Sequence, residues 1–466
     1  MLHFSSVAYT YPHAPTPAVR DITFSLRPGE ALLCTGRSGC GKSTLARLAN
    51  GLAPHYLGGG MEGEVRTVGQ NTRQSAPAQL AREAGTLFQD PESQFFALNV
   101  EDELGVALRW RGWEDAAVRE AVSESAALLG IEDLLERPIF GLSEGQKQKT
   151  ALAALLAAQP KLLVLDEPSA NLDPESTAEL ARILLRLKEK GISLFIADHR
   201  LGWLSAVADR VLVLDAGRIA AEGPFALLRD AELRRRHGLR APEVHDPRPV
   251  LPEAGEGDEA FFCCHELNFA YPKGKNIFTQ AHFAFAPGRV TALLGENGVG
   301  KTTLARLLTG LERPQGGRVL AGGRVVKPRR LPRHAQVVLQ NAGHQLRMHS
   351  ARAELEDALP EGLAPGERRR DALAHLERYA LQGLAERHPQ SLSGGEKQRL
   401  AVACATVRKP RMLILDEPTS GLDGENMRRM ADSMQQAARD GACLLVITHD
   451  LELMELACAD KITLPS

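Results

Sequence analysis

Two copies of one short phosphate-loop pattern constrain this chain more than any other feature. The pattern G-x-x-x-x-G-K-[ST] occurs at 36–44 as GRSGCGKST and at 295–303 as GENGVGKTT, after the apolar runs Ala31–Thr35 and Val290–Leu294 that predict strands. Glycines in such a loop let consecutive backbone N–H groups converge on phosphate oxygens at the start of the following helix. One chance match is uncommon, and two in the same context are far rarer. We therefore expect two phosphate-binding sites.

The side chains that end each pattern have distinct expected roles. Lys42 and Lys301 are placed to meet the outer phosphates of a nucleotide, and Ser43 and Thr302 are placed to ligate Mg²⁺. The binding residues expected in the two loops are Gly36, Ser38, Gly39, Gly41, Lys42, Ser43 and Thr44, and Gly295, Asn297, Gly298, Gly300, Lys301, Thr302 and Thr303.

The phosphate loops belong to an internal repeat that covers nearly the whole chain. From the middle of each half onward, the numbers of matching residues differ by 250, as for Asp166 and Asp416. A unit of more than about 200 residues matches a domain rather than a solenoid module. The stretch 232–259 is rich in charge, Pro and Gly, which is typical of a linker. The predicted domains are therefore 1–231 and 260–466.

Further apolar runs, separated by helical stretches, follow each phosphate loop. They are Leu162–Leu165 and Ser193–Ala197 in the first half, and Met412–Leu415 and Cys443–Thr448 in the second. Continuous apolar runs of this length are typical of parallel strands buried on both faces. Apolar residues at helical spacing in Asn99–Leu135 indicate a separate helical subdomain. The expected fold class is α/β.

Two successive acids end the second apolar run of each half. Because side chains alternate along a strand, neighbouring Asp and Glu can do separate jobs at its carboxyl end. We expect Asp166 and Asp416 to hold Mg²⁺, and Glu167 and Glu417 to polarise an attacking water molecule. An Asp-Glu pair alone is usually a solvated turn. Its place after an apolar strand and a phosphate loop favours the catalytic interpretation.

A glutamine and a histidine complete each predicted site. Gln89 and Gln340 can donate and accept at once, which suits contact with Mg²⁺ and with the attacking water. His199 and His449, just past apolar strands, are placed to hydrogen-bond the γ-phosphate. A lone histidine is more often a satisfied core or surface group, but two at matching positions favour function.

A second Ser- and Gly-rich turn leads into a helix in each half, as LSEGQKQK at 142–149 and LSGGEKQR at 392–399. Such a turn is another anion-binding site, and one nucleotide cannot readily occupy both sites of one domain. We therefore expect two domains that face head to tail, so that each phosphate loop is completed by the other domain's turn. The expected contacts are Ser143, Gly145 and Gln146, and Ser393, Gly394, Gly395 and Glu396.

Together these motifs resemble the nucleotide-binding domains of ABC ATPases, over both halves apart from the linker. The resemblance implies two tandem P-loop NTPase domains, each with a mainly parallel sheet, a helical subdomain and an antiparallel β subdomain. It implies ATP and Mg²⁺ as ligands. Tyr11 and Tyr271 match the aromatic residue that stacks on adenine, and Gln89 and Gln340 match the glutamine that also senses the membrane subunit.

A narrower resemblance covers 88–108, FQDPESQFFALNVEDELGVAL, which is similar to the ATPases of energy-coupling-factor importers and their cobalt and nickel relatives. It implies a transmembrane coupling protein as partner and, through it, a substrate-binding membrane subunit. The second half, at 339–359, keeps Gln340 and Gln345 but loses the Pro and the Val-Glu-Asp step, so the two grooves are expected to differ. Glu144 stands where the common pattern has Gly, which adds negative charge near one γ-phosphate; cobalt-type relatives tolerate this acid, so an inactive site is not predicted.

Composition and net charge restrict the cellular location and the partners that we expect for this chain. The sequence shows no secretory signal and no run of 18 apolar residues, and its seven cysteines without a C-x-x-C pair suggest reduced thiols. The net charge of −2 gives no general attraction to nucleic acid, so no nucleic-acid partner is expected. We expect an ATP-hydrolysing importer subunit bound peripherally at the cytoplasmic face of the membrane. The alternatives are the tandem ATPase of a sugar importer or exporter, and a soluble tandem ABC protein that acts on ribosomes or DNA.

Overall fold

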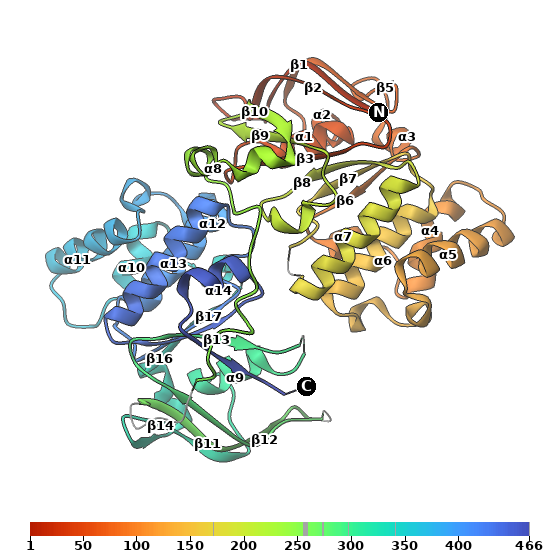
Figure 1. Cartoon of the computed structure of the whole chain (residues 1–466). Helices are drawn as coiled ribbons and strands as arrows, with labels where there is room; N and C mark the ends of the chain where they lie inside the picture. Colours follow the sequence, from red (N-terminus) through yellow and green to blue (C-terminus); the bar gives the residue numbers. More distant parts are fainter. Residues whose placement is uncertain (171, 255–259, 273–274, 297, 341, 466) are drawn as a thin grey trace. The chain divides into compact units, whose positions relative to one another are not determined.

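Two compact units make up the chain (Figure 1). The computed structural model describes residues 1–466 apart from 171, 255–259, 273–274, 297, 341 and 466. One unit comprises Met1–Glu243 with Asp423–Glu425, and the other comprises Val244–Leu422 with Asn426–Ser466. The division at Glu243 falls inside the stretch 232–259 that was predicted as a linker, and helix α8 (Ala231–His237) occupies the first residues of that stretch.

A six-stranded sheet forms the centre of the first unit, in the order β10-β9-β3-β8-β7-β6. All neighbours are parallel except β10, which is antiparallel to β9 at the edge. The central strands are buried along their whole length, as their continuous apolar runs predicted. The strands are β3 (Ala31–Gly36), β6 (Ala84–Leu87), β7 (Leu162–Asp166), β8 (Ser193–Ala197), β9 (Arg210–Asp215) and β10 (Arg218–Pro224).

A second, antiparallel sheet packs against the first with the order β2-β1-β4-β5. Their shared core includes Phe24 of the antiparallel sheet, whose ring stacks on that of Phe195 in β8 with centroids 5.9 Å apart. The phosphate-loop helix α1 (Lys42–Ala49) packs in the same core. The strands are β1 (Leu2–Thr10), β2 (Val19–Leu26), β4 (Gly60–Thr67) and β5 (Gln70–Asn71), and the short helices α2 (Leu52–His55) and α3 (Pro77–Leu80) flank β4 and β5 in sequence.

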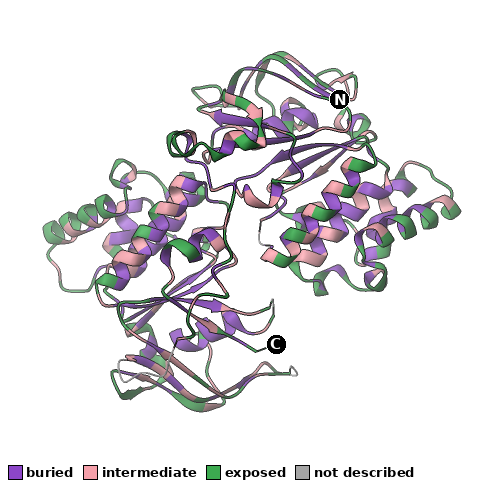
Figure 2. Ribbon diagram, in the orientation of Figure 1, coloured by how far each residue is buried: buried purple, intermediate pink, exposed green. Residues whose placement is uncertain are grey.

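Helices α4 (Val100–Trp110), α5 (Asp115–Leu129) and α6 (Glu144–Ala157) pack on one another and share a core with α7 (Pro174–Glu189). The surfaces of α4 and α5 are buried along one side and exposed along the other (Figure 2). This amphipathic arrangement is the one that the helical spacing of 99–135 predicted.

The second unit repeats this design. Its central sheet has the order β16-β17-β18-β13-β19 with all neighbours parallel, and its antiparallel sheet has the order β12-β11-β14-β15. The predicted α/β fold with a parallel core, an antiparallel sheet and a helical part is thereby confirmed in both units. The strands are β11 (Phe262–Ala270), β12 (Asn276–Phe285), β13 (Val290–Leu294), β14 (Gly316–Ala321), β15 (Arg324–Val326), β16 (Ala335–Val338), β17 (Met412–Asp416), β18 (Cys443–Ile447) and β19 (Asp460–Thr463); the helices are α9 (Lys301–Thr309), α10 (Ala351–Ala358), α11 (Pro365–Arg378), α12 (Gly394–Thr406), α13 (Gly424–Arg439) and α14 (Leu451–Ala457).

Among the residues that the structure describes, none of the helices combines the length and apolar character needed to cross a membrane.

Candidate functional site

The first phosphate loop connects β3 to α1 at the carboxyl edge of the parallel sheet. Lys42 is buried, and its Nζ donates to the carbonyl oxygens of Gly36 at 3.1 Å and Arg37 at 3.0 Å. These bonds hold the ammonium group inside the curve of the loop, at the N-terminus of α1. A backbone turn that wraps a fixed cation at a helix N-terminus is suited to bind phosphate.

Glycine is required at Gly41, the residue before α1. Its φ of 112° lies in the left-handed region, and a Cβ built there would stand 2.5 Å from Cγ1 of Val19. The second loop repeats this feature at Gly300, with φ of 113° and a Cβ position 2.4 Å from Cγ2 of Ile277. The pattern therefore encodes a specific backbone path in both units.

A hydroxyl and a carboxylate meet beside each loop. Ser43 Oγ donates to Asp166 Oδ1 at 3.0 Å, and Thr302 Oγ1 donates to Asp416 Oδ2 at 3.2 Å. Burial and the neighbouring Glu167 carboxylate raise the pKa of Asp166 to about 6, against a smaller lowering by the Ser43 hydrogen bond. Burial likewise raises the pKa of Asp416.

This pairing fits Mg²⁺. The cation prefers oxygen ligands, usually takes only one or two protein groups and completes its shell with water and substrate phosphates. Each unit offers one hydroxyl and one carboxylate oxygen in contact, next to the phosphate loop. A bound dication would also offset the unfavourable burial of the Asp166 charge.

Glu167 follows β7 with its carboxylate held from two sides. Gln89 Nε2 donates to Oε2 at 2.8 Å, and His199 Nε2 lies 3.3 Å from Oε1. Burial would raise the pKa of this carboxyl, but His199, Lys42 and Arg200 together lower it below its usual range. Glu167 is thus ionised at neutral pH, and its two oxygen atoms are held by Gln89 and His199. Its φ of 50° is uncommon for a residue other than glycine and is kept only where the surroundings enforce it.

The second unit holds Glu417 in a related way, with φ of 46°. The backbone N–H of His449 donates to Oε1 at 3.1 Å and Thr448 Oγ1 donates to Oε2 at 3.3 Å, while His449 Nε2 lies 3.9 Å from Oε1. Lys301 Nζ donates to the carbonyls of Gly295 at 2.7 Å and Glu296 at 2.9 Å. The two sites are therefore alike but not identical around the glutamate.

Each Ser-Gly turn forms the capped start of a helix. Ser143 Oγ accepts from the N–H of Gln146 at 3.3 Å while the Gln146 side chain accepts from the Ser143 N–H at 2.9 Å, a reciprocal capping box. Ser393 and Glu396 form the same box at the start of α12, with distances of 3.4 and 2.8 Å. The structure thus confirms a capped helix start at each turn, and the binding of an anion by the N–H groups of these first turns stays a prediction.

Glu144 has a cationic partner in its own helix. Its Oε1 lies 2.9 Å from Lys147 Nζ, and the same ammonium group contacts Glu92 of the short 3-10 helix Pro91–Gln94. Burial would lower the pKa of Lys147, but the two carboxylates raise it, so it stays charged. The matching Gly394 of the second unit has open space at its Cβ position. The extra acid therefore fits sterically and its charge is partly offset.

The remaining predicted residues lie around these groups. Tyr11 lies at the first loop, where its hydroxyl is 3.2 Å from Thr44 Oγ1 and accepts from Arg47 at 3.0 Å; Tyr271 is 3.4 Å from Thr303 Oγ1. Gln340 is exposed after β16. Asn297 lies outside the described residues. Ser38, Gly39 and Gly298 lie in the loops, and Gly145 and Gly395 in the first turns of α6 and α12.

The sequence analysis did not single out two buried aspartates, each of which accepts a hydrogen bond from a hydroxyl shortly after the Asp-Glu pair. Asp198 Oδ2 accepts from Ser169 Oγ at 2.8 Å, and Asp450 Oδ2 accepts from Thr419 Oγ1 at 2.7 Å. Asp198 precedes its histidine in sequence whereas Asp450 follows, so the repeat does not align them. The only sequence feature that could have identified these aspartates is that each is next to one of the predicted histidines, His199 and His449.

Comparison with known proteins gives matches over both units. The family model described as ABC transporter matches residues 19–170 and 278–420. A Treponema denticola protein that carries the provisional name ABC transporter ATP-binding protein is 35% identical over 98% of this chain and 94% of its own length. A Bacillus subtilis protein, provisionally named HMP/thiamine import ATP-binding protein YkoD, is 33% identical over 97% and 88%.

One solved structure similar to this chain is named RNase-L Inhibitor. It is 20% identical, with a TM-score of 0.64, and the match covers 98% of this chain and 87% of that one. At this level of identity the likeness shows a shared fold and nothing about the activity.

Proposed function

The chain belongs to the ABC transporter family and is an ATP hydrolase of the ABC type, and we propose that it powers a multisubunit importer of the energy-coupling-factor type. Its two domains would close head to tail on two MgATP at the cytoplasmic face of the membrane. The cargo class would be a vitamin, a vitamin precursor or a transition metal. The resemblance of 88–108 to that group supports this proposal, as does the import function in the name of the Bacillus subtilis relative.

The observation that carries the importer proposal is an exposed apolar cluster that includes Phe96 and Leu98 of the segment 88–108. Phe96, Trp110 and Phe140 expose 72%, 68% and 80% of their surface, and Leu98 is exposed as well. The rings of Phe96 and Trp110 contact edge to face, with centroids 5.3 Å apart. Ile139, next to Phe140, donates its N–H to the carbonyl of Leu98 at 3.0 Å. Such a gathering of large apolar side chains on a surface is typical of a docking site.

Side-chain hydrogen bonds fix the backbone of the segment that carries this cluster. Buried Glu103 accepts from the backbone N–H groups of Phe96 and Ala97, both at 2.8 Å, and the side chain of Gln94 accepts from Phe88 N–H at 3.2 Å. Polar side chains thus satisfy the backbone while the aromatic groups point outward. A preformed surface of this kind binds with little ordering cost.

The second unit has the equivalent glutamate and its backbone hydrogen bonds, but it lacks the apolar cluster. Glu354 accepts from the N–H groups of Arg347 and Met348, as Glu103 does for its loop. At the positions that match Phe96, Leu98 and Phe140, the second half has Arg347, His349 and Gln390. The apolar docking surface would therefore belong to the first unit. This asymmetry suits a single transmembrane coupling protein that presents two different contacts, one of them an apolar helix face.

The catalytic proposal follows from the contacts around Glu167. Lys42 would bind the outer phosphates, and Ser43, Asp166 and Gln89 would hold Mg²⁺, which when bound offsets phosphate charge. Glu167 would accept a proton from water as the water oxygen attacks the γ-phosphorus in line, and the bond from phosphorus to the leaving oxygen of ADP breaks. Gln89 and His199 keep the carboxylate oriented during this step. Glu417 would have the same role in the second unit.

Purification from membranes tests the importer proposal. We expect the tagged chain, solubilised in mild detergent, to retain an integral membrane protein that mass spectrometry identifies. The variant Phe96→Ser/Trp110→Ser/Phe140→Ser should lose this partner. The control Leu311→Ser/Val325→Ser removes comparably exposed apolar groups from the second unit and should retain it. Unchanged circular dichroism would show that both variants fold.

Retention of the membrane partner by the triple variant would contradict the docking surface. Co-sedimentation of the parent chain with ribosomes, without any membrane partner, would favour the soluble alternative instead.

A further inference from the structure

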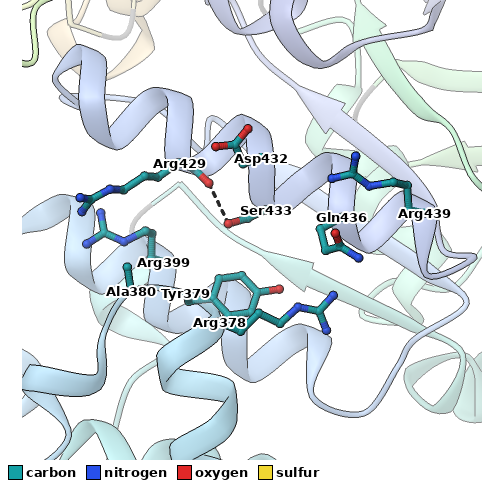
Figure 3. Close-up of a pocket in the computed structure, with 9 residues that line it drawn as sticks. All are labelled: Arg378, Tyr379, Ala380, Arg399, Arg429, Asp432, Ser433, Gln436 and Arg439. Carbon is teal, nitrogen blue, oxygen red and sulfur yellow. Dashed lines mark hydrogen bonds between the residues drawn. The ribbon is translucent and has the colours of Figure 1, made fainter. Parts of the chain in front are cut away.

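An arginine-lined pocket lies in the second unit, apart from the residues of the candidate ATP site. Its volume is about 440 Å³, and it is formed by the end of α11, by α12 and by α13 (Figure 3). A pocket of this size is large enough for a small organic ligand. The nine lining residues are Arg378, Tyr379, Ala380, Arg399, Arg429, Asp432, Ser433, Gln436 and Arg439.

One face of α13 supplies most of the wall. Residues three, four and seven positions apart share a helix face, so Arg429, Asp432, Ser433 and Gln436 line up along the pocket. Figure 3 shows Arg399 and Arg429 at one end and Arg378 and Arg439 toward the other. The polar groups of Ser433 and Gln436 lie between these two pairs.

The lining is strongly cationic. Four arginines face one aspartate, Asp432, among the nine lining residues. Arg378 pairs with Asp440, and Arg399 donates to the neutral side-chain oxygen of Asn426, so these two guanidinium groups are fixed in direction. Arg399 is almost fully buried, so its charge lies within the wall of the pocket rather than in solvent.

The first unit shows that the fold does not require this charge. The position of Arg399 is Lys149 in the first half, and that of Arg429 is Glu179; these two side chains form an ion pair at 2.8 Å. Arg439 corresponds to Glu189. The first half therefore has an acid at two of these positions, and the second half has arginine at both.

The cationic character extends into an adjoining cavity. This cavity, of about 220 Å³, shares Arg378 and Tyr379 with the pocket and adds two cations, Lys409 and Arg411, and one carboxylate, Asp440. Its His375 has a pKa lowered to about 4, first by burial and then by Arg378. Together the two cavities form a site in which positive charge predominates.

We propose that this pocket binds a small phosphate-bearing anion. Arginine guanidinium groups bind phosphate oxygens through pairs of parallel hydrogen bonds, and two arginines at each end suit a ligand with more than one anionic group. Arg399 lies on α12, the helix that begins at the Ser393 turn, so the ligand contacts the element that carries this turn. The ligand source is either a free phosphorylated metabolite or the headgroup of an anionic lipid.

Calorimetric titration with sodium pyrophosphate tests the free-ligand form. All proteins in this test carry Lys42→Ala and Lys301→Ala, so that the phosphate loops do not bind the probe. The chain with these two changes alone is called the background chain. The pocket variant is Arg429→Glu/Arg439→Glu, which introduces the glutamates that the first half has at these two positions. Arg318→Glu/Arg324→Glu, on exposed positions of the antiparallel sheet, is the control with the same charge change. The pocket variant should bind about a hundredfold more weakly than the control, about tenfold for each arginine lost.

Co-sedimentation with vesicles of phosphatidylglycerol and phosphatidylcholine tests the lipid form with the same proteins, and pure phosphatidylcholine vesicles are the blank. Circular dichroism and Tm establish that each variant is folded. A selective loss of pyrophosphate binding supports the pocket with a free ligand, and a selective loss of vesicle binding supports it with a lipid headgroup. Equal behaviour of pocket variant and control in both assays, or no binding by the background chain in either, overturns the proposal.

Discussion

The carboxylate of Asp166 should reduce the stability of the first unit when neither metal nor nucleotide is bound. It is mostly buried, beside the ionised Glu167, and these surroundings raise its pKa from the usual 3.8 to about 6. The variant Asp166→Asn removes the charge but keeps an oxygen that can accept from the Ser43 hydroxyl. We therefore expect the variant to be more stable than the parent at neutral pH.

The size of the effect follows from the pKa of Asp166. A rise of about 2 units, at about 1.4 kcal/mol each, gives a difference of about 3 kcal/mol between the two protonation states. Because the folded pKa is raised, the stabilising contribution of the protonated form is present below pH 3.8 and is lost as the pH rises through 6. Asn is neutral throughout. Its advantage should be about 3 kcal/mol at pH 7.5 and about half of that at pH 5.

Urea denaturation at pH 7.5 and pH 5, in EDTA and without nucleotide, measures this difference. The exposed Asp133→Asn is the control and should change the free energy of unfolding by less than about 0.5 kcal/mol at both values. Addition of Mg²⁺ and ADP should stabilise the parent more than Asp166→Asn, because only the parent keeps the carboxylate that we propose as a Mg²⁺ ligand.

Two results would refute this reasoning. One is an Asp166→Asn variant that is less stable than the parent at pH 7.5. The other is a stability difference that is the same at pH 7.5 and pH 5, because the effect would then come from packing rather than from charge.

Three further changes test local features of the structure. Ser143→Ala removes the cap of α6 and should lower the free energy of unfolding by about 1 kcal/mol, with partial recovery in Ser143→Thr; unchanged stability in Ser143→Ala would contradict the capping role. Lys147→Met leaves the charge of Glu144 without its cation and should raise the KM for ATP, and the added change Glu144→Gln should restore it; no rescue in a steady-state assay would mean that the charge is irrelevant. Glu103→Gln can no longer accept both backbone N–H groups well and should cost about 2 kcal/mol in thermal or chemical unfolding, unlike the exposed Glu101→Gln.

The central sheets could be predicted from the sequence because parallel strands buried on both faces leave continuous apolar runs. Val290–Leu294 and Ser193–Ala197 are strands with the expected bounds. The contacts of Ser43 with Asp166 and of Gln89 with Glu167 join residues that the motifs had already singled out. Motif spacing succeeds here because these residues lie at or shortly after the carboxyl ends of β3, β6 and β7, which are parallel strands of one sheet.

Other features depend on tertiary packing that leaves no periodic signal. In the sequence, Glu103 is one of several acids in the first turn of a helix. Only the fold shows that it is buried and bonded to the backbone at Phe96. Asp198 and Asp450 occupy non-matching positions of the repeat yet brace matching hydroxyls. The arginine pocket arises because α11, α12 and α13 meet, and three separate segments contribute to it.

The steady-state ATPase rate of the variants Glu167→Gln, Glu417→Gln and the double change tests the catalytic account most directly. Glutamine keeps the size of the side chain but cannot accept a proton from water. We expect the double variant to retain MgATP binding while its turnover falls by about 10² to 10⁴-fold, the usual contribution of a general base. Wild-type turnover in the double variant would show that neither glutamate is the base and that the proposed mechanism is wrong.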